Sequence, residues 1–128
     1  MKRDFLTILD LSFEEIDALL RRASTLKEDL TKGVLKATLT GKTLGLIFDK
    51  PSTRTRVSFE VAMYQLGGRV IFMSSQDTQL SRDEPLRDTA LVLSRYIEGL
   101  VLLQILKNHL LARKLLLLHK IILVHVGY

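Results

Sequence analysis

The sequence has no cysteine and no tryptophan, and only two of its 128 residues are proline. The absence of cysteine excludes disulfides, zinc–thiolate sites and a cysteine nucleophile. Long uninterrupted apolar runs are also missing. The leucine-rich stretch from 100 to 118 is broken by Lys107, Arg113 and Lys114, well short of the roughly 20 apolar residues that a membrane span requires. Acidic residues follow the basic start too soon to leave the apolar core of a secretory signal. We therefore expect a cytoplasmic protein with no membrane partner.

Charge is unevenly distributed along the chain. The net charge is +5, but the four Lys and Arg residues after Glu98 are accompanied by no acid, so the first 98 residues are nearly neutral. These residues show no basic stripe interleaved with aromatics, the pattern of single-strand nucleic-acid binders. We expect no nucleic-acid partner. The basic 104–118 segment predicts either a helix on an anionic surface or, more simply, a core or oligomer-facing helix.

Apolar periodicity predicts alternating helices and strands. Ser12 and Glu15 form a capping box before a helix over 12–30, and Gly67 and Gly68 would end a later helix. The predicted strands are 43–48, 69–73 and 100–103, and the further helices are 54–66 and 83–96. This order predicts an α/β fold with three layers, a mostly parallel sheet covered by helices on both faces.

The segment Pro51-Ser52-Thr53-Arg54-Thr55-Arg56 lies between a predicted strand and a predicted helix. Backbone N–H groups of a first helical turn, hydroxyls and guanidinium groups together suit a phosphate. The simpler alternative is a serine N-cap followed by solvated arginines. However, an arginine near a helix N-terminus opposes the helix dipole, and a bound anion would offset that cost.

This motif, with Ser58-Phe59-Glu60, resembles the carbamoyl-phosphate motif of the aspartate/ornithine carbamoyltransferase family. The segment from Ser74 to Pro85, followed by Asp88-Thr89-Ala90, is similar to the ornithine branch. The resemblance implies transfer of a carbamoyl group to ornithine in arginine biosynthesis, without a cofactor or metal, in a homotrimer. It also implies that Arg56 pairs with an acid such as Glu60 or Glu84. The implied carbamoyl-phosphate ligands are Ser52, Thr53, Arg54, Thr55 and Gln79, with Arg54 as the catalytic group.

The resemblance extends from about residue 5 to 100, which predicts a carbamoyl-phosphate-binding domain over 1–100 and a divergent leucine-rich tail over 101–128. Leu103 stands where the family carries an arginine at the end of the third strand. The only prolines are Pro51 and Pro85, so the family's His-Pro-x-Gln motif is absent, and so is its amino-acid-binding second domain. We expect part of an ornithine carbamoyltransferase that is inactive alone and takes ornithine only if the missing domain is supplied. The alternative is a non-catalytic anion-binding or oligomer-interaction module.

Overall fold

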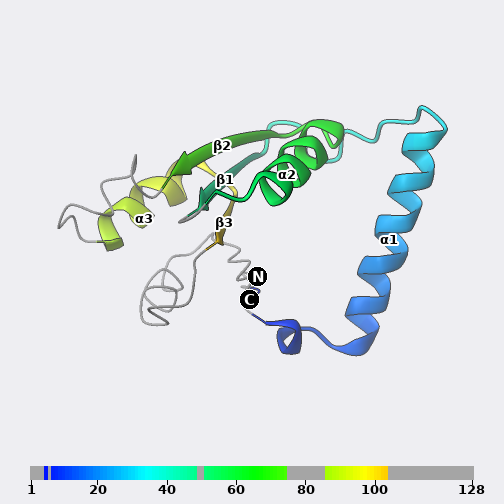
Figure 1. Cartoon of the computed structure of the whole chain (residues 1–128), viewed down its shortest axis with the longest axis horizontal. Coiled ribbons are helices and arrows are strands. Elements are labelled where there is room, and N and C mark those ends of the chain that lie inside the picture. The colour runs from blue at the N-terminus through cyan, green and yellow to red at the C-terminus, as the bar shows by residue number, and fades with distance from the viewer. Residues whose placement is uncertain (1–4, 6, 49–50, 75–85, 104–128) are drawn as a thin grey trace.

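A parallel β-sheet lies at the centre of the computed structural model, which describes residues 5, 7–48, 51–74 and 86–103 (Figure 1). The strands are β1 (Thr43–Phe48), β2 (Arg69–Ser74) and β3 (Gly99–Leu103). The helices are the short 3-10 turn η1 (Ile8–Asp10) and the α-helices α1 (Phe13–Thr31), α2 (Thr53–Gln65) and α3 (Leu86–Tyr96).

The strand order is β2-β1-β3, with β1 parallel to both neighbours. The connection through α2 leads from β1 to its neighbour β2. The connection through α3 leads from β2 back past β1 to β3, in the opposite direction across the sheet. Because such crossovers are right-handed, α2 and α3 cover opposite faces of the sheet. The predicted α/β fold with a parallel sheet is confirmed. Phe48 is in register with both Ser74 and Leu103, so the three carboxyl ends form one edge at the reversal of strand order, where such sheets bind ligands.

The core is built on the central strand. Leu46 is fully buried, and Phe48 and Val101 are each 3% exposed. Neighbouring positions on β1 and β3 are buried as well, as expected for strands covered on both faces. The partly buried side chains packed against Leu46, Phe48 and Val101 are Leu44, Phe59, Val70, Phe72 and Leu103.

Helix α1 has its predicted capping box: Ser12 Oγ accepts from the Glu15 N–H at 3.2 Å, and the Ser12 N–H donates to Glu15 Oε2 at 2.8 Å. None of its residues is buried, and Phe13 remains 80% exposed. Figure 1 shows α1 standing away from the sheet and joined to it at its C-terminal end. Its apolar stripe is therefore not part of the core around β1.

Element boundaries differ slightly from the prediction. Helix α2 begins one residue earlier, β2 extends one residue further, and η1 was not predicted. Residues 101–103 complete β3. The start of the predicted 83–96 helix and the tail over 104–128 lie outside the described residues, so the division of the chain at residue 100 stays a prediction. In the part of the chain that the structure describes, no helix has the length and apolarity to cross a membrane.

Candidate functional site

The N-terminus of α2 follows the carboxyl end of the central strand. Ser52 is the N-cap residue, but its side chain makes no capping hydrogen bond. Instead, its hydroxyl donates to Thr55 Oγ1 at 2.9 Å. The first intrahelical bond is donated by the Arg56 N–H to the Ser52 carbonyl, at 2.9 Å. Among the described residues, the N–H groups of Thr53, Arg54 and Thr55 have no hydrogen-bond partner, and such groups bind anions readily.

The side chains around these N–H groups add further donors. Ser52 and Thr55 are half-buried, and Thr53 and Arg54 are exposed. No described acid pairs with the Arg54 guanidinium. The backbone beneath it is tied down, because Ser58 Oγ donates to the Arg54 carbonyl at 2.8 Å. The structure thus brings four of the predicted ligands, Ser52 to Thr55, into one helical turn with donors available to an anion.

Arg56 has different surroundings. Its Nε donates to Glu60 Oε1 at 2.8 Å, which is the expected pairing with an acid. Its guanidinium carbon also lies 3.8 Å from the centroid of the Phe72 ring on β2. The sequence reasoning missed this cation–π contact. The sequence signals only that Phe72 is an aromatic residue in a strand next to the helix. That signal does not show that Arg56 is the residue it contacts.

Two other positions bear on the predicted site, the position of Leu103 and the remaining predicted ligand, Gln79. Leu103 ends β3 in register with Phe48 and packs against the core around Leu46. It therefore supplies an apolar side chain at the edge where the family resemblance implies an arginine. Gln79 lies outside the described residues, and its role stays a prediction.

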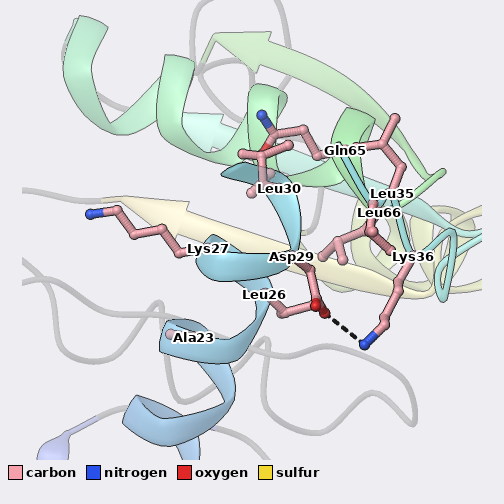
Figure 2. Close-up of a pocket in the computed structure, with 11 residues that line it drawn as sticks. Ala23, Leu26, Lys27, Asp29, Leu30, Leu35, Lys36, Gln65 and Leu66 are labelled. Carbon is pink, nitrogen blue, oxygen red and sulfur yellow. Dashed lines mark ion pairs between the residues drawn. The ribbon is translucent and has the colours of Figure 1, made fainter. Parts of the chain in front are cut away.

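The described hollow lies elsewhere, between the C-terminal half of α1 and the C-terminal end of α2 (Figure 2). Its volume is about 290 Å³, and apolar side chains such as Leu26, Leu30 and Leu66 dominate its lining. Gln65 also lines it, about 18 Å along the helix from Thr53 at 1.5 Å per residue. This distance separates the hollow from the N–H groups of the first turn.

Among the residues that the structure describes, one ion pair borders the hollow. Lys36 Nζ lies 2.6 Å from Asp29 Oδ2, as the dashed line in Figure 2 marks. The hydrogen bond from Lys36 lowers the pKa of Asp29, against the opposing effect of desolvation. The two charges of this pair neutralise each other, whereas Lys27, which also lines the hollow, has no described acidic partner. The lining is otherwise mainly apolar and lacks the convergent donors that the first turn of α2 offers.

Metal ligands do not cluster in this part of the molecule. No group of three or more His, Asp or Glu side chains suitable for a metal ion occurs among the residues that the structure describes. The first turn of α2 offers N–H and O–H donors and a guanidinium. This donor set matches an oxyanion.

Comparison with known proteins agrees with this chemistry. Residues 3–118 match the family model described as "Aspartate/ornithine carbamoyltransferase, carbamoyl-P binding domain". The match covers the sheet, the first turn of α2 and every described element.

Individual relatives are similar over the same region. An ornithine carbamoyltransferase of Desulfotalea psychrophila is 59% identical over 92 residues, which are 72% of this chain and 30% of that protein. The structure of ornithine carbamoyltransferase from Pyrococcus furiosus has a TM-score of 0.87 and 41% identity, covering 98% of this chain and 39% of that one. The catalytic subunit of M. jannaschii aspartate transcarbamoylase has a TM-score of 0.85 and 33% identity, covering 98% of this chain and 42% of that one.

The matches cover most of this chain but less than half of each matched protein. The chain spans about a third of the curated relatives that it matches. The shared region is the one that carries the uncapped first turn of α2.

Proposed function

The chain belongs to the aspartate/ornithine carbamoyltransferase family and contains its carbamoyl-phosphate-binding domain, and we propose that the first turn of α2 binds the phosphate of carbamoyl phosphate. The observation that carries this proposal is the uncapped helix start. Three N–H groups and the Arg54 guanidinium have no described partner, at the sheet edge where ligands bind in this class of fold.

The chemistry of carbamoyl transfer explains why these groups suit the reaction. An amine attacks the carbonyl carbon and phosphate leaves, so negative charge grows on the carbonyl oxygen and on the leaving phosphate. The N–H groups of residues 53–55 and the hydroxyls of Thr53 and Thr55 would hold the phosphate oxygens, and the Ser52 hydroxyl would join them by exchanging its bond to Thr55 for one to the phosphate. Arg54 would bind two oxygens at once and stabilise the developing charge. Such preorganised donors lower the barrier without a covalent intermediate.

We propose ornithine as the amino-acid substrate of the complete enzyme, with citrulline and phosphate as products. Curated relatives that are 59% and 52% identical are ornithine carbamoyltransferases, and the 74–90 segment resembles that branch. The family model and the solved neighbours also include aspartate carbamoyltransferases. The choice of ornithine over aspartate therefore rests on the curated relatives and on the 74–90 segment. The family resemblance also supports three further proposals. The complete enzyme would act in arginine biosynthesis in the cytoplasm, it would form a trimer, and Gln79 would contribute to the phosphate site across a subunit boundary.

We further propose that this chain binds carbamoyl phosphate but does not turn it over alone. Without a His-Pro-x-Gln motif, and with Leu103 at the end of β3, it lacks donors that the family uses on the carbamoyl group. Removing one charge-stabilising donor typically lowers a rate by about 10²–10³. The non-catalytic anion-binding module therefore remains the second candidate, and the apolar Leu103 is the observation that favours it.

An NMR titration of the isotope-labelled chain with carbamoyl phosphate and with inorganic phosphate tests the proposed phosphate seat, by which we mean the first turn of α2 from Ser52 to Thr55. NMR suits this test because it detects weak binding residue by residue. We expect the amide resonances of residues 53–56 to shift most. Arg54→Ala should weaken binding by about tenfold or more, since a hydrogen bond to a charged group contributes about 1.5–3 kcal/mol.

Arg69→Ala is the matched control. Arg69 is exposed at the start of β2, at the opposite end of the strands from α2's first turn, and its removal changes the net charge equally. If the two substitutions weakened phosphate binding equally, the effect of Arg54 would be one of long-range charge alone. The proposed phosphate seat would then be wrong. Citrulline formed from ornithine by the chain alone would contradict the second part of the proposal.

A further inference from the structure

The two arginines of the motif have separate environments. Arg54 has no described acidic partner, whereas Arg56 is held from two sides, by Glu60 at 2.8 Å and by the Phe72 ring at 3.8 Å. The Arg56 side chain is 45% exposed and that of Glu60 is 38% exposed. The pair is thus only partly shielded from solvent, and it adds little to global stability by itself.

The contact with Phe72 connects α2 to the ends of two strands. The Phe72 ring packs edge-on against Phe48, with centroids 5.5 Å apart and planes at 89°. Phe48 is the last residue of β1 and is 3% exposed. A continuous set of contacts therefore runs from the first turns of α2 through Phe72 to the end of the strand that precedes the phosphate motif.

The start of α2 has particular need of such an anchor. An N-cap side chain normally satisfies one N–H group of the first turn and stabilises the helix by about 1 kcal/mol. In α2 the Ser52 side chain does not do so, and Arg54 and Arg56 lie near the positive end of the helix dipole. The first turn is therefore intrinsically weak, and the bond from Arg56 to Glu60 fastens it to the next turn of the helix.

We propose that Arg56 is a positioning residue for the anion site. Through Phe72 and Glu60 it holds the uncapped turn over the strand ends, so that the N–H groups of residues 53–55 and Arg54 are already oriented before the anion arrives. Ordering these groups in advance raises affinity, because binding no longer has to order them. The inference rests on the proposed phosphate seat and assigns Arg56 no contact with the phosphate.

Three single variants and one double variant test the inference, with inorganic phosphate as the probe and NMR titration of the full chain as the measurement. Arg56→Lys keeps the charge but loses the planar guanidinium. Phe72→Leu removes the ring and adds no charge. We expect each to weaken phosphate binding by about two- to fivefold, the factor that corresponds to a partly exposed cation–π contact. Because both weaken the same contact, and Phe72→Leu removes its aromatic partner, the double variant should bind no more weakly than the worse single variant.

Glu60→Gln separates positioning from charge, and it leaves the core around Phe48 untouched if Phe72→Leu fails to fold. Removing a carboxylate near the site would tighten phosphate binding if charge alone mattered. Loss of the Arg56 anchor predicts weaker binding instead.

The outcomes are distinguishable. If Arg54→Ala binds phosphate like the wild type, or the wild type does not bind, the proposed function fails and this inference fails with it. If Arg54→Ala weakens binding but the Arg56, Phe72 and Glu60 variants bind like the wild type, only the positioning role is overturned. Lower thermal stability with unchanged phosphate affinity would likewise leave Arg56 a merely structural residue.

Discussion

Three glycines with nearly the same backbone conformation allow one packing contact to be measured. Gly33, Gly41 and Gly67 have φ of 73°, 75° and 81°. A Cβ added at Gly33 or Gly41 would meet nothing within 4 Å. At Gly67, after the C-terminal end of α2, it would lie 2.8 Å from the Ala37 Cβ. The same substitution to alanine therefore imposes similar strain at all three sites but a steric clash at only one.

The expected magnitudes follow from these two terms. An alanine in the left-handed region costs about 1–2 kcal/mol, which we expect for Gly41→Ala. Overpacking against Ala37 adds about 1–3 kcal/mol, so Gly67→Ala should lower the free energy of unfolding by about 2–4 kcal/mol. That loss is large beside the roughly 5–15 kcal/mol that stabilises a typical domain.

Urea unfolding followed by circular dichroism measures both variants. Gly41 is the better control because it lies in the turn directly before β1, whereas Gly33 follows the exposed helix α1. We expect the midpoint of Gly67→Ala to fall clearly below that of Gly41→Ala, with similar slopes. Equal midpoints would show that the contact with Ala37 relaxes at no cost, and the packing argument would be wrong.

Further predictions concern helix caps, pH and the end of β3. Ser12→Ala should lower α1 stability by about 1 kcal/mol, seen as faster amide exchange in α1, whereas Ser52→Ala removes no cap and should instead weaken phosphate binding. Lys36 lowers the pKa of Asp29, so their pairing should stabilise the fold fully above the unfolded pKa of about 3.9, and this stabilisation should be lost as pH falls through the lower folded pKa. Lys36→Met should raise the pKa of Asp29 in a carboxyl NMR titration, and an unchanged pKa would contradict that cause. Leu103→Arg should tighten phosphate binding by about tenfold through a charge-assisted bond, and unchanged affinity would mean that the end of β3 does not face the phosphate.

The sheet could be predicted from the sequence because its signals are local. The strand runs are short, apolar and bounded by glycines or polar turns, and the capping box at Ser12 and Glu15 marks a helix start directly. Each of these features depends on residues within a few positions of one another. For the same reason the start of α2 was predicted to within one residue.

The contacts of α2 were less predictable because their partners are distant in sequence or compete locally. Ser52 had the type and position of a cap, but its hydroxyl bonds to Thr55 instead. Phe72 comes sixteen residues after Arg56, and only the parallel register of β2 beside β1 brings its ring next to the end of β1. The apolar stripe of α1 predicted the helix correctly, yet it could not show that Phe13 would remain exposed.

This difference between local and distant contacts bears on what the chain can do. The described donors of the proposed phosphate seat all come from one helical turn, Ser52 to Thr55, and their support comes from Phe72 and Glu60, which the chain itself contains. Groups that would act on the carbamoyl carbon come, in the family pattern, from separate strands, and Leu103 occupies one of those positions. The proposed anion binding should therefore not depend on those groups, because its donors lie within one helical turn and their support lies in the same part of the chain.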